Sequence, residues 1–370
     1  PGETPVRTAR FLRNDSLLLL AHEDDRVCLV NSKTGKVLKT ILGSGRLDVS
    51  ADEQYAITLG AGEPLRIWRI TASKTSSMQT TSESQMPVVQ PVDLRLNREI
   101  AKLGWGAKML AVSPDGKTAV VAVKDGIFQW WDLTGEQEPK TTELPVNVNI
   151  WSAEFTPDGK RLFVDPRHGG DGALYIYNAT THELVAERNS MMRFAISPQG
   201  SLVIGRSTVG KAFLYDANTL QKRALPPSLE KRSWWCFEFL DEERVAASSF
   251  ADEQSYLTLA NLKTGEFEQD VVMPKSAERN DYFTDVGITG NRRFALVGHQ
   301  RSGVKVIDLK EGKIVARQAI FSEAQFDCHA PQGGGALFAF GQRIFALHSQ
   351  TGQLKRLRDK DFYSASLTAD

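Results

Sequence analysis

The sequence lacks an excess of charge, a cysteine pattern and a long apolar run, and each absence excludes a class of protein. Lys and Arg number 45, as do Asp and Glu, so net charge gives no reason to expect a nucleic acid or an anionic membrane as partner. Cys28, Cys236 and Cys328 match no metal-binding or haem-attachment spacing, and we expect small buried residues in a reducing compartment. The longest aliphatic run, Leu17–Ala21, is too short to span a membrane. A cytoplasmic protein is therefore favoured.

The sequence also lacks the usual catalytic and metal-binding motifs. The six histidines have no ligand spacing, no GxSxG turn is present, and the glycines at 333–335 lack the lysine of a phosphate-binding loop. The densest polar cluster runs from Asp165 to Asp171. A long turn is the plainer interpretation, and a calcium or ligand loop is the alternative, since the two carboxylates could share a cation. We expect no enzyme, no metal and no cofactor.

What the chain does contain is a unit that repeats. Lys108–Gly135 shows it most clearly, with three short strands separated by turns at Pro114-Asp115-Gly116 and Lys124-Asp125-Gly126. The second strand, TAVVAV, is apolar and β-branched, which is typical of a buried strand. No residue pattern in this unit indicates catalysis or ligand binding. The unit is important because it recurs along the chain.

Eight copies of this unit follow one another along the chain. The third strand of each unit ends at a residue that lies 38 to 63 residues from the next: Asn31, Arg69, Asp132, Asn178, Asp216, Asn261, Asp308 and His348. A short fourth strand follows in most units. A four-stranded unit with a period of about 40–45 residues is typical of β-propellers, in which neighbouring sheets bury each other's faces.

The repeats resemble the WD40-like β-propellers, including the diverged bacterial ones. The resemblance is carried by LAVSPDGKTAVVAV, Trp131-Asp132, FTPDGKRLFV and FAISPQGSLVI, and it covers nearly the whole chain. It implies an all-β fold of four-stranded antiparallel blades, eight in number, with seven blades plus an extra or shared one as the alternative. Because no Gly-His pair opens the units and the Trp-Asp pair occurs once, the polar network of strict family members is not expected.

The expected organisation is one propeller domain over residues 1–370, with one insertion. Residues 71–90 are rich in Ser, Thr and Gln and poor in large apolar residues, so we expect a surface loop. A docking segment regulated by phosphorylation is the alternative. The opening Pro-Gly-Glu-Thr-Pro, without a start Met, suggests a piece of a longer chain. The tail from Phe362 to Asp370 could close the ring or begin further sequence.

Aromatic and basic residues gather just before the first strands, where blades connect. The residues that we predict to form a partner-binding rim there are Arg46, Trp105, Trp151, Arg193, Trp235 and Tyr282, accompanied by Lys108, Lys231, Arg232, Trp234 and Phe283. Trp, Tyr and Arg are enriched in interface hot spots. Packing between blades is the alternative explanation for each aromatic residue.

The first strand of the eighth unit departs from the others. Its alternating apolar column reads Asp327 and His329, whereas Phe326 and Cys328 occupy the polar column. A one-residue bulge before Pro331 would exchange the two faces of the strand. A polar pair at the central channel, formed by Asp327 and His329, is the alternative.

The function that this pattern favours is a non-catalytic scaffold that binds another protein or peptide on its rim. Two other functions stay open. One is an enzyme or cofactor-binding propeller of the quinoprotein or haem type. The other is an accessory sensor domain of a larger signalling protein. We expect a protein or peptide partner, no nucleic acid, no membrane, and a monomer or part of a longer chain.

Overall fold

The computed structural model describes most of the chain, and all structural statements below concern that part. The described residues are 6–12, 17–22, 26–31, 36–42, 46–50, 53–59, 64–72, 92–103, 107–135, 137–166, 173–251, 254–273, 283–289, 291–299, 303–318, 326–329, 336–340, 343–347 and 351–357.

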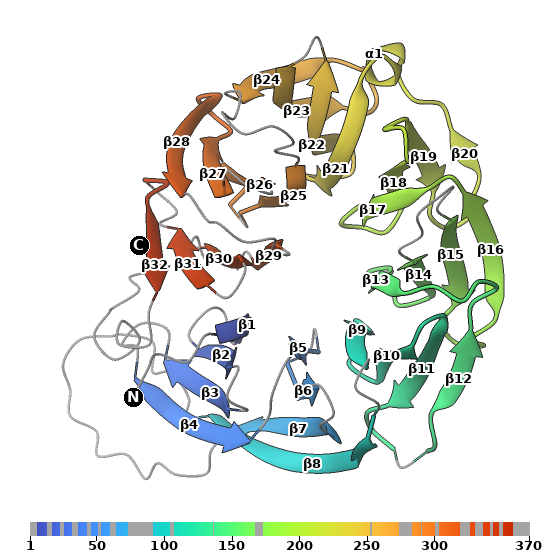
Figure 1. Cartoon of the computed structure of the whole chain (residues 1–370), viewed down its shortest axis with the longest axis vertical. Helices are drawn as coiled ribbons and strands as arrows, with labels where there is room; N and C mark the ends of the chain where they lie inside the picture. The colour runs from blue at the N-terminus through green and yellow to red at the C-terminus, as the bar shows by residue number, and fades with distance from the viewer. Residues whose placement is uncertain are drawn as a thin grey trace.

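These residues form eight four-stranded antiparallel sheets arranged around a common axis (Figure 1). We number the sheets as blades 1 to 8 in chain order. The strands of blades 1 to 4 are β1 (Val6–Leu12), β2 (Leu17–His22), β3 (Arg26–Asn31), β4 (Val37–Leu42); β5 (Arg46–Val49), β6 (Tyr55–Leu59), β7 (Pro64–Ala72), β8 (Val92–Lys102); β9 (Lys108–Val112), β10 (Thr118–Lys124), β11 (Ile127–Asp132), β12 (Lys140–Glu143); β13 (Ile150–Phe155), β14 (Arg161–Pro166), β15 (Ala173–Asn178) and β16 (Leu184–Asn189).

Blades 5 to 8 repeat the same order of strands, and one short helix, α1 (Pro227–Glu230), connects blades 5 and 6. Their strands are β17 (Met192–Ile196), β18 (Leu202–Arg206), β19 (Ala212–Asp216), β20 (Lys222–Arg223); β21 (Ser233–Phe239), β22 (Arg244–Ala251), β23 (Gln254–Asn261), β24 (Phe267–Met273); β25 (Phe283–Ile288), β26 (Phe294–His299), β27 (Gly303–Asp308), β28 (Lys313–Gln318); β29 (Phe326–His329), β30 (Ala336–Phe340), β31 (Arg343–Leu347) and β32 (Leu354–Leu357).

The ring closes without a shared strand. Each blade consists of four consecutive strands, and β1 of blade 1 contacts β29, β30 and β31 of blade 8. The eight-blade prediction is therefore confirmed for the described residues, and the alternative of seven blades with a shared or extra unit is wrong. The tail 362–370, which was a candidate for closing the ring, lies outside the described residues.

The turn between the first and second strands has the same chemistry in several blades. In blade 3 the Ser113 hydroxyl donates to Asp115 Oδ1 at 2.7 Å and accepts from the Thr118 amide at 2.9 Å. In blade 4 Thr156 and Asp158 form the corresponding 2.7 Å bond. These side chains satisfy backbone groups that the tight turn leaves without a strand partner. The recurring Pro-Asp-Gly sequences therefore fold as predicted.

The polar residue at the end of the third strand fixes the next turn. Asp132 Oδ1 accepts the backbone amides of Thr134 at 2.8 Å and Gly135 at 3.0 Å. Asn178, Asp216, Asn261 and Asp308 accept from the amides two and three residues ahead in the same way. The Thr219 amide and Arg223 lower the pKa of Asp216 to about 2, although burial opposes this. These five exit residues are thus turn formers, whereas Arg69, the predicted exit residue of the second unit, lies inside β7 because that strand continues to Ala72.

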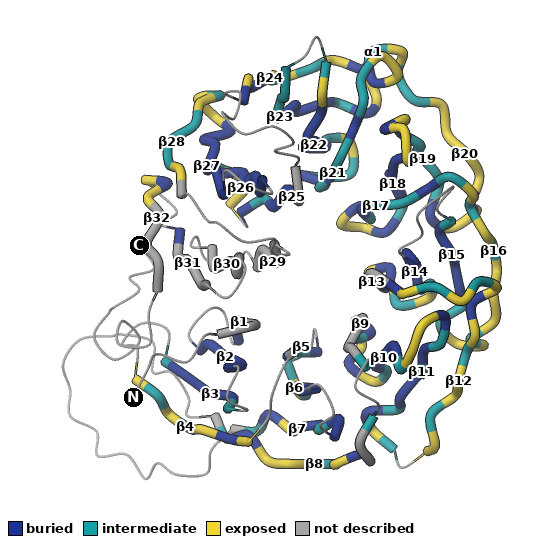
Figure 2. The backbone as a smooth tube through the Cα atoms, in the orientation of Figure 1, coloured by how far each residue is buried: buried dark blue, intermediate teal, exposed yellow. Residues whose placement is uncertain are grey.

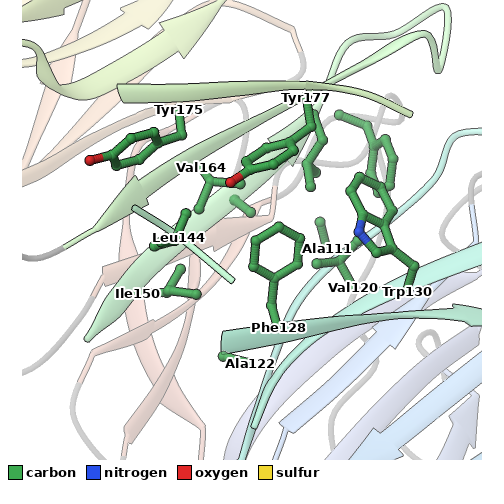
Figure 3. Close-up of a cluster of buried hydrophobic side chains, with 13 residues drawn as sticks. Ala111, Val120, Ala122, Phe128, Trp130, Leu144, Ile150, Val164, Tyr175 and Tyr177 are labelled. Atoms are coloured by element: carbon green, nitrogen blue, oxygen red, sulfur yellow. The ribbon is translucent and has the colours of Figure 1, made fainter. Parts of the chain in front are cut away.

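Apolar side chains between neighbouring blades form the core (Figure 3). Between blades 3 and 4, Phe128 packs edge-on against Tyr177 with ring centroids 5.3 Å apart, and Trp130 stacks on His182 at 4.3 Å. Phe128 and Tyr177 are almost completely buried. Both faces of an interior blade are covered in this way, as stacking of the repeats requires.

Exposure concentrates on the outermost strands of blades 1 to 7 (Figure 2). The outer strand of blade 2, β8, pairs with β7 as far as Ala72 opposite Val92. Thr71 and Ala72 therefore belong to a strand, and the predicted loop boundary at 71 is wrong because the hairpin is longer than the apolar pattern indicates. Residues 73–90 of the predicted loop lie outside the described residues.

The first strand of blade 8 shows a displaced register. Seven residues, 330–336, separate His329 from its partner Leu337, whereas six residues, 289–294, separate Ile288 from Ala295 in blade 7. The pairing of β29 with β30 is therefore offset by one residue relative to blade 7, and the exchange of the two faces between Phe326, Cys328 and Asp327, His329 stays a prediction.

Candidate functional site

The first strands begin, and the second strands end, at one edge of the ring, which we call the upper edge. This follows from the antiparallel order of each blade. Arg46 and Trp151 lie at the start of β5 and next to the start of β13, and Arg193 and Trp235 lie near the starts of β17 and β21. Trp105 and Tyr282 lie outside the described residues. The predicted rim residues that the structure places therefore share this edge.

Arg193 is held by the preceding blade in an unusual backbone conformation. Its φ is +45°, within a break in the β17–β18 register between Met192 and Ala195. A positive φ is strained for a residue with a side chain unless its surroundings hold it there. The buried carboxylate of Asp165, at the end of β14, accepts the Arg193 amide at 3.0 Å. Asp165 therefore stabilises the strained backbone conformation of Arg193.

The Arg193 side chain reaches across to blade 6. Its Nη1 lies 3.8 Å from Cys236 Sγ on β21, and β17 and β21 are neighbouring first strands (Figure 1). Arg193 and Trp235, which were predicted as separate members of the rim, thus lie in one small region.

Arg206, which the sequence analysis did not single out, completes this region. It ends β18, and its Nε donates to the Trp235 carbonyl at 2.9 Å while its guanidinium lies 5.0 Å from the centre of the Trp235 ring. Burial lowers the pKa of Arg206, and the positive charge of Arg193 lowers it further. Two guanidinium groups therefore lie close together beside a half-buried tryptophan.

Two exposed apolar side chains border the same region. Val209 is 80% exposed in the turn between β18 and β19, and Phe250 is 45% exposed near the end of β22. The Trp234 amide donates to the Gly210 carbonyl at 2.8 Å, which ties this turn to β21. Ser233, the residue before Trp234, pairs with Phe250. We call Arg193, Arg206, Val209, Trp235 and Phe250 together the blade 5–6 rim.

Two residues that accompany the predicted rim have structural roles. Trp234 is fully buried, and its indole Nε1 donates to the Leu229 carbonyl at 2.6 Å. Arg232 pairs with Asp270, and its guanidinium lies 4.7 Å and 4.5 Å from the ring centres of Tyr256 and Phe267. Packing between blades, the alternative explanation for the aromatic residues, is therefore correct for Trp234, and Arg232 contacts residues of its own blade.

Charged residues also lie on the innermost strands. Arg10 on β1 pairs with Asp48 on β5 at 3.1 Å. Glu154 on β13 has an exposed side chain, but the surrounding protein displaces part of its hydration shell, and this desolvation raises its pKa to about 7. Its neighbours Ala153 and Phe155 face the core between blades 3 and 4. Asp327 and His329 occupy β29, opposite Ala339 and Leu337.

Within the described ranges, no group of three or more His, Cys, Asp or Glu side chains is arranged to hold a metal ion. Asp165 contacts Arg193, and Asp171, its predicted companion in a calcium loop, lies outside those ranges. Cys28 and Cys236 are buried free thiols, as predicted. No helix in the described part of the chain is long and apolar enough to cross a membrane.

The fold and its repeated four-stranded blades define a WD40-like β-propeller. No family model and no curated protein matches the sequence. Among solved structures, the chain is similar to the C-terminal WD40 domain of Sif2, with a TM-score of 0.65 and 14% identity over 92% of this chain and 95% of that one. It is also similar to a eukaryotic initiation factor, with a TM-score of 0.56 and 13% identity over 96% and 89% of the two chains. These similarities show the fold.

Proposed function

We propose that this chain is a non-catalytic platform that binds another protein or peptide on the upper edge of its ring, around blades 5 and 6. The observation that carries the proposal is the meeting of Arg193 with the segment Trp235-Cys236 of the next blade, 3.8 Å apart at Cys236. Arg and Trp supply large, oriented contact area and are enriched in hot spots. The fold itself, shared with a WD40 domain, is compatible with many functions and does not choose among them.

The rest of the predicted rim extends this surface around the ring. Arg46 and Trp151 belong to strands that begin at the same edge in blades 2 and 4. With Trp105 and Tyr282 they remain predicted contributors to partner binding. A partner that covers several blades would use the ring as a rigid support, since each blade is held by two neighbours.

The test is recovery of partner protein from the native source on immobilised wild type and variants. Trp235→Ala and Trp151→Ala should reduce recovery strongly, because loss of one hot-spot anchor typically weakens binding by about 2 kcal/mol or more. Lys117→Ala is the control at the opposite edge, where the lysine side chain is 66% exposed beside Asp115. It should recover the partner as wild type does.

Melting curves by circular dichroism accompany each capture. Trp235 is half-buried beneath Arg206, so its removal also tests packing. Folded Trp235→Ala and Trp151→Ala proteins that keep the partner would contradict the proposal, as would loss of the partner in Lys117→Ala. Should Trp235→Ala fail to fold, Arg193→Ala carries the same test, because its removal leaves the core between the blades intact.

A further inference from the structure

The turns after the third strands, which we call exit turns, have the same backbone shape in blades 4 to 7. In each, the amide of the fifth residue donates to the carbonyl of the first at 2.8–2.9 Å, as from His182 to Asn178. The fifth residue has a positive φ in all four blades: +63° at His182, +60° at Leu220, +77° at Gly265 and +63° at Gly312. Glycine adopts this conformation freely, whereas a residue with a side chain is strained there. His182 and Leu220 therefore need contacts that offset the strain.

His182 has such a contact with the preceding blade. Its imidazole stacks on the indole of Trp130 in blade 3, with ring centroids 4.3 Å apart and ring planes at 13°. Trp130 is buried in the core between blades 3 and 4. Lys140 on β12 adds a second link, because its Nζ donates to the Thr181 carbonyl at 2.6 Å. We call Trp130, Lys140 and His182 together the blade 3–4 clasp.

Lys140 is the charged residue that acts on His182. Its ammonium group bonds to the carbonyl directly before His182 and forms no ion pair with a carboxylate in the described part of the chain. Other titratable groups of the adjoining elements leave this charge uncompensated. Asp132 at the end of β11 is engaged by amides of its own turn, Glu183 is exposed to water, and Tyr177 on β15 keeps its proton because burial raises its pKa.

Blade 5 has a similar arrangement without a titratable side chain at the strained position. Leu220 is buried in the core between blades 4 and 5. Arg188 on β16 donates to the Leu220 carbonyl at 2.7 Å, as Lys140 does to the exit turn of blade 4. Apolar packing is therefore sufficient to hold a strained exit turn. The imidazole of His182 adds a charge that depends on pH, which packing does not require.

We propose that the blade 3–4 clasp is a pH-sensitive junction, in which neutral His182 holds the exit turn of blade 4 on blade 3 and protonation of His182 releases this turn. Protonation charges a partly buried imidazole and places a second cation near Lys140. The positive φ at His182 then favours release, because the stacking no longer offsets the strain. The clasp lies at the edge opposite the upper edge, so the inference is independent of the proposed function.

The direction of the effect follows from the pKa of His182. Burial and the charge of Lys140 lower this pKa from 6.5, although a hydrogen bond to the Ala179 backbone opposes them. The unfolded state therefore binds this proton more tightly than the folded state does. The stabilisation is complete above pH 6.5 and is lost as the pH falls through the lowered pKa. Because the raised pKa of Glu154 has the opposite effect on stability, the test needs a readout of this turn alone.

Hydrogen–deuterium exchange at pH 5 and pH 7.5, corrected for the intrinsic effect of pH on exchange, provides that readout. In wild type, peptides covering residues 178–183 should lose protection at pH 5, by up to about tenfold for each unit by which the pKa of His182 is lowered. His182→Leu copies the arrangement of blade 5 and should keep its protection at both pH values. The exit turn of blade 5, residues 216–221, is the internal control in every sample and should not change.

NMR titration of the histidine rings measures the pKa of His182 directly, with its resonance identified by its loss in His182→Leu. The pKa should lie below 6.5, and Lys140→Gln should raise it. Lys117→Gln is the matched control, since this lysine side chain is 66% exposed beside Asp115, and it should leave the pKa unchanged. Should His182→Leu fail to fold, His182→Gly replaces it, because glycine is not strained at this φ.

Three results would overturn the inference. One is protection of residues 178–183 that is equal at both pH values in wild type. Another is an equal loss of protection in His182→Leu. The third is a pKa of His182 at or above 6.5, which would show that attraction of the imidazolium to the Trp130 ring outweighs burial and Lys140. None of these results bears on partner recovery at the upper edge, so the proposed function is tested separately.

Discussion

At the scale of single residues, two neighbours in sequence have opposite roles. Trp234 lies in the core between blades 5 and 6, while Trp235 lies half-buried at the upper edge under Arg206. The register break between Trp234 and Cys236 separates them. The sequence identifies both as aromatic residues before a first strand, but which of them faces the core depends on a bulge that alternation alone does not predict.

Truncation of these two residues should therefore have different consequences. Trp234→Ala removes a fully buried side chain and its 2.6 Å bond to the Leu229 carbonyl, so we expect a loss of about 3–5 kcal/mol in the free energy of unfolding. Trp235→Ala should cost less, because Trp235 is only partly buried and packs against the edge of a core cluster. Urea unfolding of both variants measures this, and equal losses would show that Trp235 is a core residue.

The raised pKa of Glu154 predicts how the stability of the fold depends on pH. Because its pKa is raised from 4.5 to about 7 in the folded protein, the folded state holds this proton more tightly than the unfolded state does. The resulting stabilisation is complete below pH 4.5 and is lost as pH rises through about 7. Glu154→Gln should make stability less dependent on pH in this range and raise it at pH 8 relative to wild type.

Thermal melting of wild type and Glu154→Gln at pH 5 and pH 8 measures this difference. Glu183→Gln is a control, because Glu183 is exposed in the turn before β16; it should change neither value. Parallel pH profiles for wild type and Glu154→Gln would contradict the prediction.

At the scale of elements, turn chemistry explains why the blades could be predicted. Side chains such as Ser113 with Asp115, and Asp132 at the end of the third strand, bond within five residues along the chain. Local bonds of this kind leave a sequence signature that repeats. The end of the β7–β8 hairpin leaves no such signature, because Ala72 and Val92, which pair there, are 20 positions apart in the sequence.

The insertion in blade 2 gives a prediction at this scale. Ala72 pairs with Val92, so a short Gly/Ser link in place of residues 73–91 can close the hairpin between two paired ends. Since the segment has little apolar content to offset the cost of ordering it, the melting temperature should stay within a few degrees. Differential scanning calorimetry provides the measurement, and a large drop would show that the segment packs against the blades.

At the scale of the whole molecule, the fold is predictable from the sequence and most of the site is not. The period, the turns and the eight units specify the ring. The contacts of Arg193 with Asp165 of blade 4 and with Cys236 of blade 6 join residues 28 and 43 positions apart. Such contacts depend on how neighbouring blades stack. Arg206, Val209 and Phe250 therefore could not be assigned to the rim from sequence.

The ring also explains why binding at one edge is a reasonable function for this chain. Blades 5 and 6 are packed through a shared core that includes Leu214, Trp234 and Phe237, so the upper edge is a fixed surface. The opposite edge consists of turns whose polar side chains, such as Thr156 and Asp158, are engaged with their own backbone. The upper edge is thus a fixed surface for a partner, whereas polar side chains at the opposite edge are already bonded within their own turns.

Hydrogen–deuterium exchange of the protein, alone and with its recovered partner, tests the central claim most directly. We predict that the partner slows exchange in peptides covering the start of β17, the turn at Ser207–Gly210 and the start of β21, with little change in the turns at Ser113–Lys117 and Thr156–Lys160. Slower exchange confined to those opposite-edge turns, or to the outer strands β4 and β8, would contradict the claim that blades 5 and 6 hold the partner at the upper edge.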